Sequence, residues 1–273
     1  MKRGGVRLSA QGFTIVETLI VLAVTSTLFL AAALLVNGKQ SKTNFQVGIR
    51  TIQQRFQQII NETVSGYYPD NGNFSCRALG GPPLSIGSAS PSGQGTNQDC
   101  IFVGKTLVVG GVSYSVYPLA GRRDINGHDV QTPKEAYITA IAKSTANPSA
   151  PTVPSIEIPN GFTYAKGRAA NSAVWTTGPF ATAFISSLGN FLNNGTDTSG
   201  SQQMNVATYS AWDPSKSDAD NINIEATKPS PYPLATSGVQ YCFNSGTTNQ
   251  SVIVAISSGL NVTTSIKNGA NCP

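Results

Sequence analysis

The fold of this chain is decided near its N-terminus, by the stretch Gln11-Gly12-Phe13-Thr14-Ile15-Val16-Glu17. This stretch opens an unbroken apolar run over residues 13–36. At ~1.5 Å per residue, such a run is long enough to cross the ~30 Å hydrocarbon core of a bilayer as a helix. The leader before it, residues 1–12, contains basic residues and no acid. The stretch therefore predicts a helix that crosses a membrane.

Glu17 is the one charged residue in the apolar run. A carboxylate inside hydrocarbon costs roughly 2.5–3.5 kcal/mol on insertion scales, so it indicates a function and a partner. Because residues 13–36 contain no lysine or arginine, we expect the partner to come from another chain or from a charge created by processing. Cleavage after Gly12 would create the α-amine of Phe13, which is largely cationic at neutral pH. Packed helices would then bring the amine of one chain to Glu17 of the next.

Two plainer interpretations of the run stay open. A secretory signal peptide also starts with basic residues, but its apolar core is normally roughly 7–15 residues long and its cleavage site follows that core. The nearest small-residue site of this kind is Ala31-Ala32-Ala33. An ordinary single-span anchor tolerates an occasional polar residue, but it leaves the cost of burying Glu17 unexplained.

The segment Gly12-Phe13-Thr14-Ile15-Val16-Glu17-Thr18-Leu19-Ile20 resembles the cleavage and methylation signal of type IV prepilins and of type II secretion pseudopilins. The resemblance implies that a prepilin peptidase cuts after Gly12 and methylates Phe13, and that Glu17 directs subunit assembly. It covers the N-terminal part of the chain and implies little about the rest. The chain departs from the common pattern of the family because its apolar run contains no proline.

The resemblance implies a structural subunit of a type IV pilus-like filament that supports adhesion, motility or uptake. Its implied partners are other pilin subunits, prepilin peptidase, the membrane and the pilus assembly machinery. Before assembly it would be a single-pass protein of the inner (cytoplasmic) membrane with its globular domain outside, and after assembly it would lie in a cell-surface pilus. Two alternatives stay open: a type II secretion or competence pseudopilin, and a membrane-anchored surface adhesin that forms no filament.

An amphipathic continuation of the helix is predicted over residues 37–65. Apolar residues recur there at steps of three or four, while lysines, arginines and glutamines fill the other side. Gly66 and Pro69 then predict the end of the helix, and Gly48 marks a place where the helix can bend. The stripe expected to pack on the globular body consists of Phe45, Ile49, Ile52, Phe56, Ile60 and Val64.

Residues 66–273 are predicted to form one β-rich globular domain, because short β-prone runs alternate there with turn clusters. The overall expectation is an α+β, type IV pilin-like fold, in which a long N-terminal helix packs on a C-terminal antiparallel β domain. Surface loops are expected over residues 80–98, 144–154, 193–203 and 213–233. The predicted strands are residues 101–103, 106–109, 113–117, 136–142, 162–165, 173–176, 180–188, 206–212, 239–243, 251–256 and 260–266.

Four cysteines lie in this domain, and their even number fits an oxidising compartment outside the membrane. Four cysteines allow three connectivities. We favour Cys76–Cys100 and Cys242–Cys272, because each of these pairings is local in the sequence. A metal site built on the cysteines is disfavoured, because there is no Cys-x-x-Cys motif and His128 is the only histidine.

Charge and composition argue against several classes of function. Only 11% of the residues are charged, and beyond residue 65 eleven basic residues balance eleven acidic ones. The body therefore carries no basic footprint for nucleic acid. Glycine, serine, threonine and asparagine are abundant, which suits an extracellular β protein better than a cytosolic enzyme.

Motifs for catalysis or cofactor binding are weak, so we expect no enzyme and no cofactor. Gly104-Lys105-Thr106 ends like a phosphate-binding loop, but Asp99 stands where that motif needs glycine. His128 lies near Asp124 and Asp129, yet the surrounding segment predicts a polar turn, and no nucleophile motif accompanies it.

A weak calcium candidate remains in the loop expected over residues 213–233. Asp213, Asp218 and Asp220 offer the carboxylate oxygens that calcium prefers. Their spacing misses the helix-loop-helix pattern, because Ile222 occupies a ligand position. A solvated acidic loop is the alternative.

Overall fold

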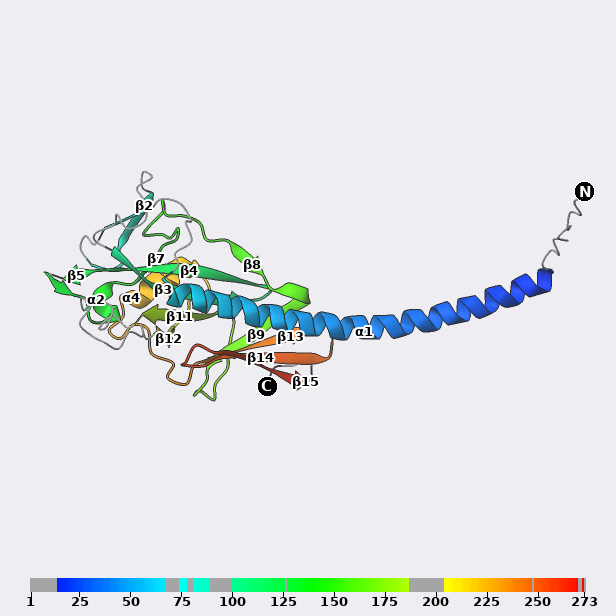
Figure 1. Cartoon of the computed structure of the whole chain (residues 1–273). Coiled ribbons are helices and arrows are strands. Elements are labelled where there is room, and N and C mark those ends of the chain that lie inside the picture. The colour runs from blue at the N-terminus through cyan, green and yellow to red at the C-terminus, as the bar shows by residue number, and fades with distance from the viewer. Residues whose placement is uncertain are drawn as a thin grey trace, which may run out of the picture. The chain divides into compact units, whose positions relative to one another are not determined.

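The computed structural model describes residues 14–66, 74–77, 81–88, 100–125, 127–186, 204–246, 248–269 and 272. The fold is α+β: one long N-terminal helix, α1 (Ile15–Val64), is followed by antiparallel strands (Figure 1). The chain divides into two compact units, Met1–Asn44 and Phe45–Pro273, so α1 contributes residues to both. The boundary falls inside the helix, at the point where the amphipathic stripe begins.

Helix α1 has the predicted extent. It ends where Gly66 adopts a left-handed conformation (φ 66°), which glycine takes without the penalty a side chain imposes. The Gly66 N–H donates to the carbonyl of Thr63 at 3.1 Å, and the Ser65 N–H donates to the carbonyl of Asn61 at 2.9 Å. These bonds satisfy carbonyls that the last turn would otherwise leave unpaired. Pro69, the second part of the predicted stop signal, lies outside the described residues.

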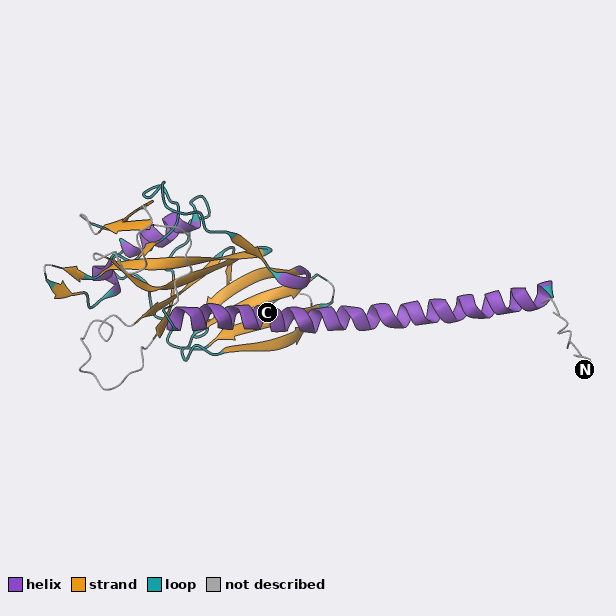
Figure 2. Ribbon diagram, turned by 45° about the horizontal axis from the view of Figure 1, so that its top comes forward, coloured by secondary structure: helices purple, strands orange, loops and turns teal. Residues whose placement is uncertain are grey.

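The second unit is built around two antiparallel sheets (Figure 2). The larger sheet has the strand order β12-β11-β3-β4-β7, with β8 added beside β4. Its centre is the hairpin of β3 and β4, which turns at Gly111 and Val112. The strands of this sheet are β3 (Cys100–Gly110), β4 (Ser113–Arg122), β7 (Thr139–Ala140), β8 (Ser155–Glu157), β11 (Phe180–Ser186) and β12 (Met204–Thr208).

The smaller sheet has the order β10-β9-β13-β14-β15. Its strands are β9 (Phe162–Ala169), β10 (Thr176–Thr177), β13 (Val239–Ser245), β14 (Gln250–Ile256) and β15 (Val262–Asn268). Two short ribbons complete the described strands: β1 (Phe74–Arg77) with β2 (Ser85–Ser88), and β5 (Asp124–Ile125) with β6 (His128–Asp129). The remaining elements are α2 (Pro133–Ala136), the 3-10 turn η1 (Pro159–Gly161) and α4 (Asp218–Ala226).

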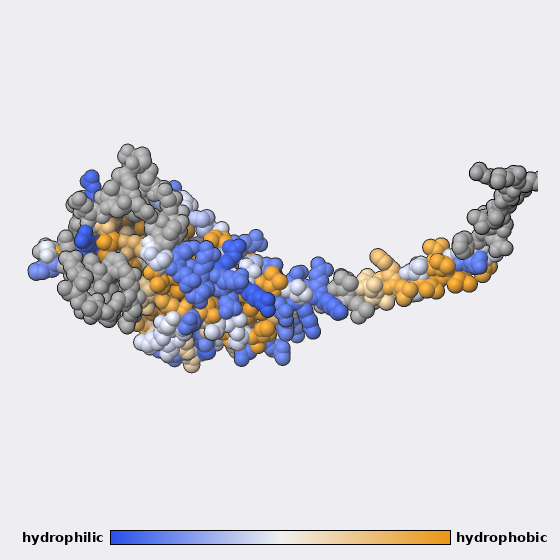
Figure 3. All heavy atoms as spheres, viewed as in Figure 1, coloured by the Kyte–Doolittle hydropathy of each residue, from blue (hydrophilic) through white to orange (hydrophobic). Residues whose placement is uncertain are grey.

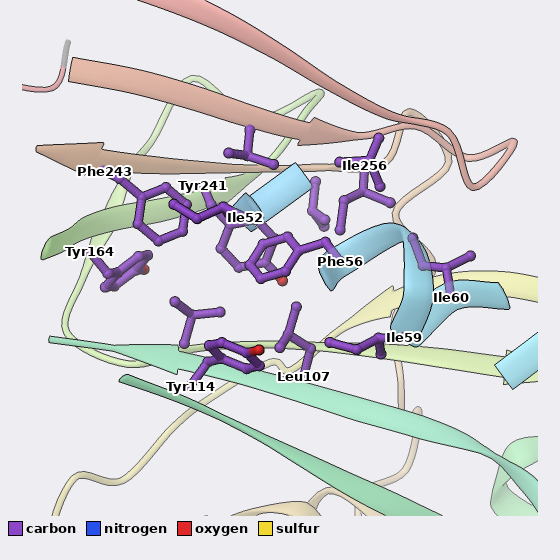
Figure 4. Close-up of a cluster of buried hydrophobic side chains, with 14 of the residues drawn as sticks. Ile52, Phe56, Ile59, Ile60, Leu107, Tyr114, Tyr164, Tyr241, Phe243 and Ile256 are labelled. Atoms are coloured by element: carbon purple, nitrogen blue, oxygen red, sulfur yellow. The ribbon is translucent and has the colours of Figure 1, made fainter. Parts of the chain in front are cut away.

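Residues 45–64 of α1 fill the space between the two sheets. Figure 4 shows Phe56 of this helix between aromatic rings of both sheets. Its ring centroid lies 5.5 Å from that of Tyr241 on β13 and 6.0 Å from that of Tyr114 on β4, both in edge-to-face geometry. Because aromatic side chains carry the largest apolar areas, Phe56 links the helix to both layers of the core.

The predicted stripe of α1 is correct except at its last position. Phe45, Ile49, Ile52, Phe56 and Ile60 are buried, whereas Val64 is 39% exposed. Thr63 is buried in its place, with its hydroxyl bonded to the carbonyl of Ile59 at 2.6 Å. Thr63 follows Phe45 by five turns at ~3.6 residues per turn, so it stays in phase with the stripe. Repeated steps of four residues exceed the period of ~3.6 residues per turn, so Val64 lies off the buried face.

Gly48 allows close packing of α1 against β9. The helix continues through it without a break, and α1 is a single element from Ile15 to Val64. A Cβ at this position would lie 2.5 Å from the ring of Phe162, far inside contact distance. The glycine therefore lets the start of β9 approach the helix axis, and Phe162 in turn stacks on Phe45 with ring centroids 5.4 Å apart.

Most predicted strands are present, several of them longer than expected. The segments 101–103 and 106–109 form one strand, β3, with an irregularity between Phe102 and Gly104. The segments 162–165, 180–188, 206–212, 239–243, 251–256 and 260–266 correspond to β9 and β11 to β15, with shifted ends. Residues 187–203, which include the end of one predicted strand and the loop 193–203, lie outside the described residues, as do most residues of the loop 80–98.

Three predictions for the second unit are wrong. Residues 136–142 contain the end of α2 and only the short β7, because Thr132 and Glu135 form a capping box that starts a helical turn. Residues 173–176 contribute only Thr176 to a strand. The expected loop over residues 213–233 contains α4, which starts at an N-cap, Ser217, whose hydroxyl accepts from the N–H of Asp220.

Candidate functional site

Thr14 and Glu17 form a capping box at the N-terminus of α1. The carbonyl of Thr14 accepts the first helical bond, from the N–H of Thr18, which makes Thr14 the N-cap. The Glu17 carboxylate accepts hydrogen bonds from the Thr14 N–H at 3.0 Å and from the Thr14 hydroxyl at 3.1 Å. The Glu17 N–H donates back to that hydroxyl at 3.2 Å. The carboxylate thus lies at the positive end of the helix dipole, where a negative charge is stabilised.

This arrangement gives Glu17 neutral hydrogen-bond partners within its own chain, while the charged partner expected for it stays a prediction. Both of its hydrogen bonds reach the same oxygen, Oε2. Among the described residues no donor contacts Oε1, and the side chain is exposed. The carboxylate is therefore partly satisfied within α1 and keeps one oxygen for a further donor. The signal was present in the sequence as Thr-x-x-Glu before an apolar run. Gly12 and Phe13, the predicted processing residues, lie outside the described residues.

The helix surface around this site is apolar (Figure 3). The segment Ile15–Ala33 is long and apolar enough to cross a membrane, and none of it is buried within the fold. Ile15 is 80% exposed and Phe29 76% exposed. A surface of this size is costly in water, so it indicates a membrane anchor, a signal segment or a surface covered by other molecules.

The threonine hydroxyls in this segment are satisfied by the helix itself. Thr18, Thr25 and Thr27 each donate to a backbone carbonyl three or four residues earlier, at 2.8 Å. Such bonds remove the cost of placing a hydroxyl in hydrocarbon. Glu17 is therefore the one group of the span Ile15–Ala33 that carries a charge into an apolar surrounding.

We predict that replacing Thr14 by valine loosens the first turn of α1. The variant loses the hydroxyl that accepts from the Glu17 N–H, and loss of an N-cap costs about 1 kcal/mol. Hydrogen exchange of the Glu17 amide, measured by NMR on the full chain in micelles, should become about fivefold faster. Thr14→Ser keeps the hydroxyl and should retain the protection. Equal exchange rates in Thr14→Val and the unmodified chain would show that the capping box does not form.

Both predicted disulfides are present. Cys76 on β1 is bonded to Cys100 at the start of β3, and Cys242 on β13 is bonded to Cys272 beyond β15. In the chain-entropy model each closed loop contributes about 3–4 kcal/mol to stability. The second bond ties the C-terminal residues to the smaller sheet. Two disulfides indicate that this unit lies in an oxidising compartment outside the cytoplasm.

The three aspartates of the calcium prediction lie near the start of α4 and do not converge. Asp213 accepts hydrogen bonds within its own turn. Asp218 accepts from the Tyr117 hydroxyl at 3.1 Å, and Asp220 accepts from the N–H of Thr145 at 2.8 Å. Among the described residues no group of three His, Cys, Asp or Glu side chains is placed to hold a metal. The carboxylates organise a helix N-terminus, and the calcium site stays an unsupported prediction.

The remaining sequence candidates occupy structural positions. His128 is exposed on the β5–β6 ribbon, opposite Ile125, and Gly127 provides the turn with φ 82°. The side chains of Asp124 and Asp129 lie outside the described part of the structure. The Gly104-Lys105-Thr106 segment forms part of β3, as the mismatch to a phosphate-binding loop predicts.

Lys105 belongs to a partly buried ion pair that the sequence did not reveal. Its ammonium lies 2.7 Å from the carboxylate of Glu62 on α1, and its side chain is only 2% exposed. Partial burial by itself raises the pKa of Glu62, but hydrogen bonds from Lys105 and Gln58 and the charge of Lys105 outweigh it. The pKa of Glu62 therefore lies below its ordinary value. The pair fixes the last turns of α1 to the centre of the larger sheet.

We predict that Glu62→Gln destabilises the second unit at neutral pH but not in acid. Folding lowers the pKa of Glu62, so its contribution is present above the unfolded-state value of ~4.3 and is lost as pH falls through the lower folded-state value. Urea unfolding at pH 7 should show a loss of roughly 1.5–3 kcal/mol, and the difference from the unmodified chain should shrink near pH 3. Glu157→Gln, an exposed control on β8, should show no such change with pH. A difference of equal size at both pH values would contradict the assignment.

A comparison with protein-family models, with curated proteins and with solved structures finds no match for this chain. Its function therefore has to be argued from its own residues.

Proposed function

We propose that the chain is a structural subunit of a type IV pilus-like filament. The observation that carries the proposal is the one charged group of an exposed apolar helix, Glu17, placed in the first turn directly after the Gly12-Phe13 junction. An ordinary anchor has no use for such a group. A subunit that polymerises through its helices does have a use for such a group, because the charge can fix how neighbouring helices align.

Processing supplies the partner for this charge. A prepilin peptidase cuts between Gly12 and Phe13 and methylates Phe13, and the new α-amine has an ordinary pKa near ~8. In the filament the amine of one subunit meets the free oxygen of Glu17 on the next. Helix association from lipid into a protein core gains little from the hydrophobic effect, so this charge pair decides the register of the subunits.

The remainder of the chain has the properties of the outward-facing part of such a subunit. Residues 13–36 hold the precursor in the cytoplasmic membrane, and the disulfide-bonded β unit lies on the outer side. After assembly the apolar helices form the filament core and the β unit forms the surface. The pilus assembly machinery and other pilin subunits are the partners that this arrangement requires.

The first experiment is mass spectrometry of the N-terminus of the mature protein. We expect a chain that begins with N-methylated Phe13 and lacks residues 1–12, and we expect Gly12→Leu to keep its leader. A mature chain that starts at Met1 would overturn the proposal and favour a membrane-anchored adhesin. Electron microscopy of surface filaments, labelled on this chain, then separates a pilus subunit from a pseudopilin of a short secretion or uptake device.

A further inference from the structure

The outer face of the β3–β4 hairpin carries a cavity of about 470 Å³. This volume lies within the range of small-molecule sites, roughly 300–1,000 Å³. The strands place a row of hydroxyl groups along one face of it, because alternate residues of a strand point to the same side. We call this cavity the hydroxyl trough and define it by Ser113, Ser115, Tyr117, Ser155, Tyr164 and Asp218.

The register of the sheet explains how these groups meet. Ser113, Ser115 and Tyr117 alternate along β4, and Ser155 on β8 lies directly opposite Ser115. On the other side of β4, Val108 pairs with Ser115 and Gly110 pairs with Ser113, so the floor of the trough is made of small side chains. The larger sheet is therefore polar over this patch, as is ordinary for the outward face of an antiparallel sheet.

Asp218 provides the charge of the trough. It comes from the first turn of α4, and its Oδ2 accepts from the hydroxyl of Tyr117 at 3.1 Å. No other described residue bonds its second oxygen. The described residues lining the trough include no lysine, arginine or histidine. A ligand with a phosphate or carboxylate would therefore meet an unpaired negative charge, which disfavours anions.

Several hydroxyls of the trough lack partners. Within the described part of the chain, the side chains of half-buried Ser113 and exposed Ser155 make no hydrogen bond, so they are open to a ligand. The Tyr164 hydroxyl is buried without a partner, which is costly for that group alone. Hydroxyl groups both donate and accept, so a ligand with many hydroxyls of its own satisfies them in either direction. Tyr117, which is only half-buried, adds aromatic surface of the kind that covers the apolar faces of a sugar ring.

We propose that the hydroxyl trough binds a neutral sugar residue, either free or at the end of a surface glycan. Asp218 accepts hydrogen bonds from neighbouring hydroxyls of the sugar, and the serines of β4 and β8 complete the polar contacts. The floor of the trough, which contains glycine, leaves space for the sugar ring. The inference does not depend on filament assembly, and it gives the β unit a ligand of stated chemistry.

The test is saturation-transfer NMR on the full chain in micelles of a detergent without a sugar headgroup. The probes are glucose, galactose, mannose and N-acetylglucosamine at millimolar concentration, with glucose 6-phosphate as the anionic counterpart. We expect at least one neutral sugar to show transfer and glucose 6-phosphate to show none. Absence of transfer to every neutral sugar would overturn the proposal.

Variants locate the binding. Asp218→Asn should weaken it roughly tenfold or more, because hydrogen bonds to a charged acceptor are the strong ones. Ser155→Phe places a ring over the trough from an exposed position on an edge strand and should abolish binding while thermal unfolding stays unchanged. Asp213→Asn, which removes an exposed carboxylate outside the trough, is the matched control and should bind as before. Binding that survives both Asp218→Asn and Ser155→Phe would place the site elsewhere and refute the assignment.

Discussion

Glu17→Leu is expected to insert into the membrane normally and to form no filaments. The replacement removes a charge that costs roughly 2.5–3.5 kcal/mol in hydrocarbon, so insertion becomes easier. In the proposed filament it would also remove the acceptor for the N-terminal amine of the neighbouring subunit, which would leave that amine as an uncompensated charge inside the helix core. Assembly should therefore fail although the precursor is made, inserted and cleaved.

Three measurements separate these effects: membrane fractionation, N-terminal mass and electron microscopy of filaments. Thr18→Val is the matched control, because it removes a polar group one position further along the same turn without changing charge. Glu17→Gln keeps the size and the hydrogen bond to Thr14 but loses the charge, and it should also fail to assemble. Normal filaments from Glu17→Leu would refute the role proposed for this carboxylate.

Phe56→Ala is expected to be the most damaging single change in the β unit. Phe56 is 2% exposed and contacts rings of both sheets. Loss of a buried phenylalanine costs about 3–5 kcal/mol, out of a total stability of roughly 5–15 kcal/mol. At about 2–4 °C per kcal/mol for a unit of this size, the melting temperature should fall by roughly 6–20 °C.

Calorimetry of the full chain with its disulfides intact measures this effect. Val64→Ala, near the end of the same helix, is the control, because Val64 is 39% exposed and lies off the buried stripe. Its melting temperature should stay within a few degrees of the unmodified chain, on the scale of surface substitutions of about ±0.5 kcal/mol. Similar losses in Phe56→Ala and Val64→Ala would mean that Phe56 does not join the two sheets.

Local patterns predicted the parts of the fold that depend on nearby residues. The steps of three and four along α1 and the glycine after it, Gly66, are local signals. The two disulfides were predictable because both join segments close in sequence. Where local signals were misjudged, as at Val64, the error came from treating a period of 3.6 as repeated steps of four.

Helix α4 was missed because it is short and half of its buried residues are polar. Asn221, Asn223 and Glu225 lie inside the unit and make hydrogen bonds to backbone or side chains elsewhere, for example from the N–H of Ala140 to Asn223 at 2.9 Å. Its apolar period consists only of Ala219, Ile222 and Ala226, which is too short a pattern to stand out among the polar residues of an expected loop. The Lys105–Glu62 pair escaped for a similar reason, since it exists only once helix and sheet are docked.

The candidate sites likewise include features that nearby residues predict and features that only the folded chain creates. Glu17 was predictable, because a single acid in an apolar run stands out in any sequence. Its bond to Thr14 was also encoded locally, as a capping box. The cost of burying the charge nevertheless favoured the prediction of a charged partner from another chain or from processing. The hydroxyl trough was not predictable, because it depends on the register that sets Ser155 opposite Ser115 and on the position of α4.

The capping box of α1 has a consequence for how the proposed contact between subunits would form. Because Thr14 already bonds Oε2 of Glu17 in the isolated chain, the carboxylate is held in one orientation before any neighbour arrives. An amine that docks on the remaining oxygen would then meet an acceptor that is already in place, and little further side-chain entropy would be lost on contact. The first turn of the helix thus preorganises the carboxylate for binding.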